Sequence, residues 1–174
     1  AIGSQENNVH LSGVYGVTIS GNTIYSCTNR NLLIENSRLV TVGSNHFRRH
    51  TPSRGTGMRL VSSEDCTVSG CTLHDESENG QKSGASLLEL EKCQRIAITG
   101  CVLTDGVPYG IDAADCSDLR VTGSIITDKR KVQKSRGALN FTGKGKRNGV
   151  ASNNLSGKIN ISPEVEVKLH ENIN

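Results

Sequence analysis

Three charged residues, Arg59, Glu89 and Asp112, occupy equivalent places in successive repeats of the sequence. Side chains along a strand point alternately to opposite faces, so a polar residue between two apolar ones faces away from the core. Stacking such strands would align these three residues about one strand spacing apart, roughly 4.8 Å. The sequence thus predicts a charged column on an outer face, with Glu91 beside Glu89. The flanking apolar pairs are Met58 and Leu60, Leu88 and Leu90, and Ile111 and Ala113.

Two carboxyl groups at this spacing could hydrolyse a glycosidic bond. One would act as the acid and the other as the nucleophile or base, and one strand spacing fits a retaining geometry better than an inverting one. Glu89 and Asp112 are the candidates, with Arg59 beside them. The alternative is an exposed salt-bridge ladder, in which alternating charges only avoid repulsion.

A lyase is the second chemistry that these residue types could support. It needs a base that removes the proton next to a uronate carboxyl, and a cation that stabilises the resulting negative charge. His74 or His50 could be the base, with Arg59 or Arg49 as the cation. Of these histidines, we take His74 as the catalytic candidate.

No cofactor is expected, although one cation stays possible. Ca²⁺ could replace the arginine of the lyase, with Asp75, Glu76 or Asp105 supplying oxygen ligands. The sequence contains no Cys-x-x-Cys pair and no Cys/His metal spacing, which disfavours zinc and iron–sulfur sites.

Five polar segments of different length follow the repeats, at residues 25–30, 48–56, 74–84, 104–109 and 127–136. Loops on one edge of a rigid scaffold often form a binding groove. The alternative is that the charged loops are simply solvated, and for any single loop we favour that interpretation. The residues that we expect to bind substrate are Arg48, Arg49, His50, Asp75, Lys129 and Arg130.

These candidates depend on a repeat that the chain writes seven times, most clearly as Gly-Val-Thr-Ile-Ser-Gly-Asn-Thr-Ile at 16–24. Self-similarity at such intervals is typical of solenoids. Each copy follows a second apolar alternation, and no stretch has a helical period. The sequence predicts an all-β, single-stranded parallel solenoid of about seven rungs, in one domain over 1–174. The anchor residues, 19 to 30 positions apart, are Asn22, Asn45, Cys71, Cys101, Ser124, Asn153 and Asn172.

The repeated unit resembles the right-handed parallel β-helix of the pectin-lyase-like superfamily over about residues 9–172. That resemblance implies the fold and a carbohydrate-active protein acting on or binding an extended polysaccharide. Members of the superfamily include polysaccharide lyases, polygalacturonase-type hydrolases, uronate epimerases and phage tailspikes. A non-catalytic structural, adhesin or tailspike-like binding module is therefore the alternative.

Several signatures of these enzymes are missing from the sequence. It lacks the Asn-Thr-Asp, Gly-His-Gly and Arg-Ile-Lys motifs of polygalacturonases and the Asp-Pro-His-Glu motif of alginate epimerases. The resemblance places charged groups on the first strand of each rung and on its loops, but it does not choose the reaction. The basic loops slightly favour an acidic glycan.

The anchor position predicts a ladder of inward polar side chains. In such coils an inward Asn can bond the rungs above and below, as expected for Asn22 and Asn45. Cys71 and Cys101 stand at the same place in later rungs, where we expect small buried side chains rather than reactive thiols. A disulfide between neighbouring rungs is the alternative.

Composition excludes some partners. The net charge of +3 is modest, and only five of 174 residues are aromatic, which disfavours stacking on nucleic-acid bases. No apolar run approaches the roughly 20 residues of a membrane-spanning helix. We expect neither nucleic acid nor membrane insertion.

The ends of the coil need covering, because a bare rung exposes apolar side chains and unpaired backbone. The sequence shows no amphipathic capping helix, so we expect a piece of a longer β-helix protein, or ends covered by another chain. A mature secreted chain, a cytosolic chain and an excised piece all fit this sequence. For a polysaccharide-active protein we expect a secreted or cell-surface location.

Overall fold

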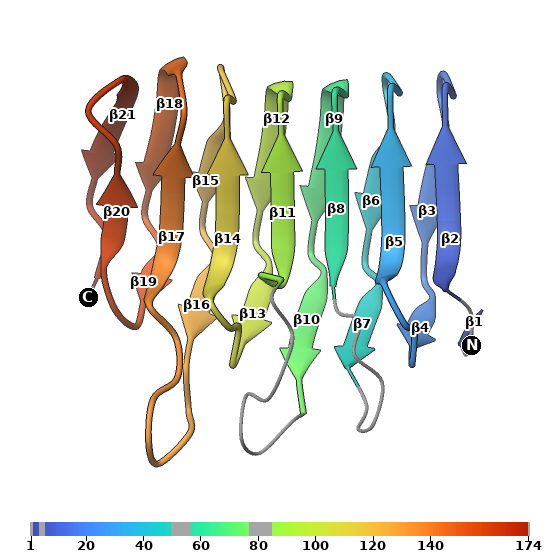
Figure 1. Cartoon of the computed structure of the whole chain (residues 1–174), viewed down its shortest axis with the longest axis horizontal. Coiled ribbons are helices and arrows are strands. Elements are labelled where there is room, and N and C mark those ends of the chain that lie inside the picture. The colour runs from blue at the N-terminus through green and yellow to red at the C-terminus, as the bar shows by residue number, and fades with distance from the viewer. Residues whose placement is uncertain (1, 4–5, 50–56, 77–84, 174) are drawn as a thin grey trace.

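The computed structural model describes residues 2–3, 6–49, 57–76 and 85–173, and they form a coil of parallel strands (Figure 1). Three seven-stranded parallel sheets run along this described coil. We name them sheets A, B and C. A rung passes from sheet B to sheet C and then to sheet A before the next rung begins. The predicted all-β, right-handed parallel β-helix with about seven rungs is confirmed.

Sheet B contains the second apolar alternation of each repeat, in strands of three to six residues. Their inward residues are apolar and buried, as at Met58 and Leu60 or Leu88 and Leu90. The strands are β2 (Asn7–Ser12), β5 (Arg30–Glu35), β8 (Met58–Val61), β11 (Leu88–Glu91), β14 (Tyr109–Ala114), β17 (Gly137–Thr142) and β20 (Ile159–Ile161).

Sheet C contains the anchor strands that precede the repeated Ser-Gly turn. It consists of β3 (Thr18–Ser20), β6 (Thr41–Gly43), β9 (Glu64–Ser69), β12 (Gln94–Thr99), β15 (Arg120–Thr122), β18 (Gly145–Ala151) and β21 (Val165–His170).

Sheet A contains the short third segment of each rung. It consists of β1 (Ile2–Gly3), β4 (Thr23–Tyr25), β7 (His46–Arg49), β10 (Thr72–Asp75), β13 (Val102–Thr104), β16 (Ile125–Thr127) and β19 (Asn154–Leu155).

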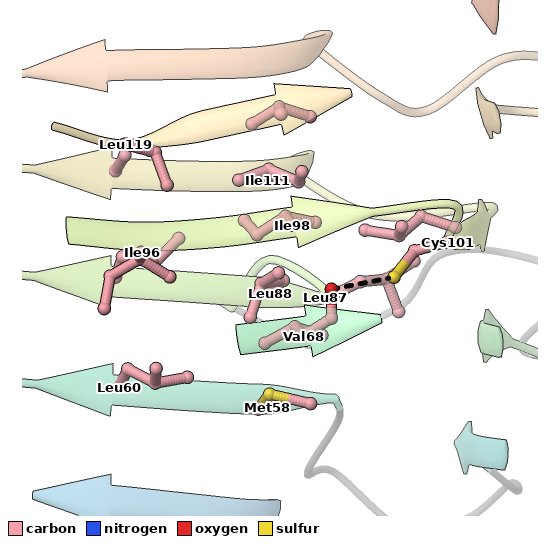
Figure 2. Close-up of a cluster of buried hydrophobic side chains, with 14 of the residues drawn as sticks. Met58, Leu60, Val68, Leu87, Leu88, Ile96, Ile98, Cys101, Ile111 and Leu119 are labelled. Carbon is pink, nitrogen blue, oxygen red and sulfur yellow. Dashed lines mark hydrogen bonds between the residues drawn. The ribbon is translucent and has the colours of Figure 1, made fainter. Parts of the chain in front are cut away.

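The core fills the inside of the coil with aliphatic side chains and thiols from all three sheets. Fully burying one large aliphatic side chain contributes roughly 1.5–3 kcal/mol, so the repeated stack of such residues stabilises every rung against its neighbours. Figure 2 labels part of this core: Met58, Leu60, Val68, Leu87, Leu88, Ile96, Ile98, Cys101, Ile111 and Leu119.

The predicted anchor ladder is present at the turn from sheet C to sheet A. Asn45 accepts a hydrogen bond from the Asn22 backbone at 3.0 Å and donates one to the Ile19 carbonyl at 2.9 Å. Asn153 accepts one from the Ser124 backbone at 2.9 Å. These buried amides satisfy backbone groups that the turn leaves without a strand partner.

The anchor cysteines fill the same place as the asparagines with a smaller side chain. The Cys71 and Cys101 thiols lie 3.6 Å from the Val42 and Val68 carbonyls, the latter marked in Figure 2. Burial raises the pKa of the thiol of Cys66, which lies on β9 and not at an anchor position. The expectation of buried thiols is confirmed, and the structure shows no disulfide among the cysteines, which are Cys27, Cys66, Cys71, Cys93, Cys101 and Cys116.

Where the structure describes them, the variable segments join the end of a sheet A strand to the start of the next sheet B strand, along one corner of the coil (Figure 1). Parts of two of them, 50–56 and 77–84, lie outside the described residues. This corner therefore borders sheet B. None of the described residues forms a helix that could span a membrane.

Candidate functional site

The predicted column lies on the outer face of sheet B, in the register expected from the sequence. Arg59 pairs with Glu89 across β8 and β11, and Glu89 pairs with Asp112 across β11 and β14. Asp112 then pairs with Asn140, although the next anchor strand contains an extra residue. That extra residue is a bulge in β18, between Gly145 and Asn148. The whole column is His10, Leu33, Arg59, Glu89, Asp112, Asn140 and Asn160.

A groove of about 480 Å³ opens over the middle of this column. Arginines lie toward one end and Asp112 and Asn140 toward the other, because successive strands supply successive parts of the lining. The volume falls within the range of natural small-molecule sites. The lining residues are Arg30, Arg59, Glu89, Leu90, Glu91, Asp112, Ala114, Asn140 and Thr142.

Glu89 is held by two cations and a backbone amide. Its carboxylate accepts a hydrogen bond from Arg30 Nη2 at 2.7 Å and one from the Ser86 N–H at 3.0 Å. Arg59 Nε lies 3.9 Å away. The side chains of Arg30 and Glu89 are only 11% and 18% exposed, so little water screens this ion pair.

Sequence reasoning missed Arg30. Its partner is 59 positions away and two strands across the sheet, and Arg30 opens β5 outside the alternation that marked the column. No local sequence pattern indicates that an arginine will contact a carboxylate two strands away. Only the burial of an arginine at the start of a strand distinguishes it, and burial is a tertiary property.

Arg59 forms its shorter ion pair with Glu91 rather than Glu89. Arg59 Nη2 lies 2.6 Å from Glu91 Oε2. Glu91 is the last residue of β11, the strand that also contains Glu89. The salt-bridge ladder proposed from the sequence is therefore present for Arg59, Glu89 and Glu91. It does not extend to Asp112.

Asp112 is half-buried and faces no cation within the described residues. Its one described hydrogen bond comes from Asn140 Nδ2 at 2.8 Å. Burial raises the pKa of Asp112 and the neighbouring Glu89 charge adds to the rise, while the Asn140 hydrogen bond opposes it. A carboxyl group whose pKa is raised in this way, inside a groove, holds its proton to a higher pH than an ordinary aspartate and is a candidate general acid.

His74 lies on sheet A and is not among the residues that line the groove. It occupies β10, where its register partners are Arg48 and Thr104, and its Nε2 is 3.4 Å from Asp105 Oδ2. The structure therefore does not bring His74 and Arg59 together on one strand face. Of the lyase pairings expected from the sequence, this geometry separates His74 from Arg59, whereas those that use His50 or the Arg49 side chain lie outside the described residues.

The expected substrate-binding residues divide between two places on the loop corner. Arg48 is partly exposed and pairs with Glu76 at 2.7 Å, while Asp75 is buried and engaged. His50 and the side chain of Arg49 lie outside the described residues. Of the described side chains, neither Arg48 nor Asp75 is among the residues that line the groove.

The loop between β16 and β17 is built around Asp128. This buried carboxylate accepts hydrogen bonds from Arg130 Nε at 2.8 Å and from the Lys134 and Ser135 amides at 2.8 and 2.9 Å. Burial alone would raise the pKa of Asp128, but these donors together lower it to about 2. Arg130 thus holds the loop together, whereas Lys129 remains exposed to solvent.

No metal site is formed by the residues that the structure describes, in the sense of three or more His, Cys, Asp or Glu side chains close enough to hold one ion. Asp105 instead accepts the Lys129 amide at 2.6 Å. Among the possible calcium ligands, Asp75 is buried and Glu76 pairs with Arg48.

The chain belongs to the family of the right handed beta helix region, which matches residues 2–155. This agrees with three parallel sheets, an inward anchor ladder and loops along one corner. This family is defined by its fold, and membership of it does not specify a reaction. No curated protein matches the chain in sequence.

Solved structures include the same fold. A crystal structure of a "putative glycosyl hydrolase" from Parabacteroides merdae superimposes with a TM-score of 0.61 at 12% identity, covering 87% of this chain and 82% of that one. Polygalacturonase from Erwinia carotovora gives a TM-score of 0.42 at 9% identity, with 89% of this chain matching 52% of that one. At these identities the first likeness establishes the fold alone.

Proposed function

We propose that the outer face of sheet B binds an extended acidic polysaccharide and that the protein hydrolyses it. The observation that carries this proposal is the half-buried Asp112, which has a raised pKa inside a groove and lies one strand from Glu89. Two neighbouring carboxyl groups in different environments are the requirement for acid and nucleophile roles.

Asp112 would be the general acid. It would give its proton to the oxygen of the leaving sugar as the glycosidic bond breaks. Glu89 would attack the anomeric carbon and form a glycosyl ester, which water would then hydrolyse with Asp112 as the base. Strand neighbours stand about 4.8 Å apart, close to the roughly 5–5.5 Å of retaining enzymes.

The arginines favour an acidic substrate. Arg59 is 38% exposed and lies in the groove, so its guanidinium can reach a uronate carboxylate while it remains near Glu91. Arg30 holds Glu89 from the buried side and fixes its position. A substrate running across the strands would meet Arg59 before it meets Asp112.

A non-catalytic binding module is the second candidate. It is favoured because both oxygens of Glu89 already accept hydrogen bonds, from Arg30 and from the Ser86 amide. Such a carboxylate is a weaker nucleophile. In that case the groove would bind the glycan without cleaving it.

A degradation screen on neutral and uronic polysaccharides tests the proposal. Reducing ends without unsaturated sugars, lost in Asp112→Asn and in Glu89→Gln, would support the hydrolase. Glu35→Gln is the matched control, because this carboxylate lies on sheet B outside the groove and pairs with His10. We expect the acid variant to lose about 100- to 10,000-fold in rate.

Other outcomes of that screen point elsewhere. Unsaturated products would overturn the hydrolase in favour of a lyase, and binding without cleavage would favour the binding module. Calcium remains part of the proposal as a possible requirement. Activity that a chelator abolishes and Ca²⁺ restores would establish it.

A further inference from the structure

A second hollow lies on the outer face of sheet C, away from the groove. Across β15, β18 and β21, Arg120, Gly149 and Lys168 stand in one register column. Thr122, Ala151 and His170 form the next one. In each column a small residue separates two long or polar side chains, so the middle strand is the floor of a trough.

The trough encloses about 400 Å³. At position 149 the missing side chain leaves room for Arg120, because a Cβ there would come within 3.3 Å of Arg120 Cδ and Nη1. The Arg120 guanidinium therefore lies against the backbone of β18. This volume fits one sugar unit together with its hydration, at the lower end of natural binding sites.

Positive charge dominates the walls. Arg120, Arg147 and Lys168 line the hollow with one carboxylate, Glu166. Asp118 holds the Arg147 guanidinium through two hydrogen bonds of 2.6 Å. Arg120 Nη1 donates hydrogen bonds to the Leu119 and Arg147 carbonyls, and among the described residues neither Arg120 nor Lys168 forms an ion pair, so both keep a positive charge for a ligand.

Positive charge is also concentrated in the part of the sequence that forms the hollow. Residues 1–118 contain nine Lys and Arg against thirteen Asp and Glu, a net charge of −4. Residues 119–174 contain eleven against four, a net charge of +7. A field of this sign attracts anions to the rungs that carry the hollow.

We propose that the hollow between β15 and β21 binds an anionic sugar unit, with Arg120 and Lys168 on its carboxylate or sulfate and Thr122 on a hydroxyl. The choice of a sugar rests on the proposed function, whereas the choice of an anion rests on the hollow itself. The site would hold a second stretch of acidic glycan away from the groove.

Titration calorimetry of the whole protein with a uronic acid, a sulfated monosaccharide and a neutral sugar tests this. We expect the acidic sugars to bind and the neutral one to bind at least tenfold more weakly. Lys168→Gln, Arg120→Gln and the filling variant Gly149→Thr should each weaken acidic-sugar binding at least tenfold. Lys92→Gln, a lysine on sheet B's rim, is the matched control.

Each result decides the matter. Unchanged binding in all three variants, or no binding of either acidic sugar, would overturn the site. If inorganic sulfate bound as tightly as the acidic sugars, the hollow would be an anion site without selectivity for a sugar, and that part of the proposal would be wrong. Asp112→Asn should keep this binding, so loss of polysaccharide cleavage with retained calorimetric binding would separate failure of the groove from failure of the hollow.

Discussion

Two aspartates of the same coil, the half-buried Asp112 and the buried Asp128, have pKa values that are shifted in opposite directions. Asp112 sits in the sheet B groove, and its pKa is raised because burial outweighs a single hydrogen bond from Asn140. Asp128 sits in the loop after β16, and its pKa is lowered to about 2 because Arg130 and three backbone amides outweigh its burial. The residue type is the same, and the number of donors differs.

The comparison shows which site suits chemistry and which suits structure. A carboxylate saturated with donors has no reason to take up a proton and holds its loop in place. A carboxyl group with one donor and a neighbouring carboxylate keeps its proton to a higher pH than an ordinary aspartate, which suits a general acid. The predictions below change the donors around each aspartate or remove its charge.

The largest expected effect concerns Arg30, the cation that stabilises the carboxylate next to Asp112. Arg30→Met should lower the free energy of unfolding by about 3 kcal/mol, because Glu89 would remain mostly buried without its partner. Urea denaturation measures this. Adding Glu89→Gln should recover part of the loss, and Arg38→Met, which removes an exposed pair with Asp65, should cost far less. Equal losses in Arg30→Met and Arg38→Met would contradict the prediction.

The next effect is at Asp128 itself. Asp128→Asn should destabilise the protein by about 2 kcal/mol at pH 7, since a depressed pKa contributes stability above the unfolded value of 3.8. That contribution is lost as the pH falls toward about 2, so the two proteins should converge there. Denaturation series at several pH values measure it. A difference that stays constant down to pH 2 would show that the charge is irrelevant.

A smaller effect should follow from giving Asp112 the cation that Asp128 has. Asn140→Lys replaces a neutral donor 2.8 Å from Asp112 by an ammonium group, which lowers the pKa of Asp112. The alkaline limb of the pH–rate profile should move to lower pH. Cleavage at pH 7 should fall about tenfold for each unit by which the pKa of Asp112 is lowered. Carbon-detected NMR titration of Asp112 reads the same shift without any activity.

Asn160→Lys is the matched control for that variant, because Asn160 continues the column one strand beyond Asn140. It should leave the Asp112 titration nearly unchanged. If both lysines shifted it equally, the general field of the face would be responsible rather than the direct contact.

The smallest effect has the opposite sign to that at Asp128. Asp112→Asn should stabilise the protein at neutral pH, because a raised pKa means that the folded state disfavours the charged form. The native state then holds more protons than the unfolded one, so stability falls as the pH rises above the unfolded pKa. The gain should vanish below about pH 4. A loss of stability at pH 7 would show that the Asn140 hydrogen bond outweighs burial.

The register of the charged column was predictable from residue pattern alone. Alternation placed Met58 and Leu60 inside and Arg59 outside, and repetition aligned Arg59 with Glu89 and Asp112. This worked because parallel stacking repeats one backbone geometry at every rung, so a local period of two becomes a position in space. The anchor ladder followed from the same repeat.

The partners of these residues were not predictable. Arg30 reaches Glu89 across an intervening strand, and Arg59 chooses Glu91 over Glu89. Arg130 was expected to meet substrate, yet it is the buried partner of Asp128. Long side chains and loops carry no period, so their contacts depend on which neighbours the fold brings within reach.

The sequence by itself determined the coil, its rungs, its inward ladder and the residues that share each outer column, because all of these follow from periodic backbone geometry. Only the tertiary structure decided which carboxyl groups are neutralised and which are free to take a proton. Glu89 and Asp112 are adjacent in register and similar in type. Burial, and the number of donors that distant segments bring to each oxygen, set them apart.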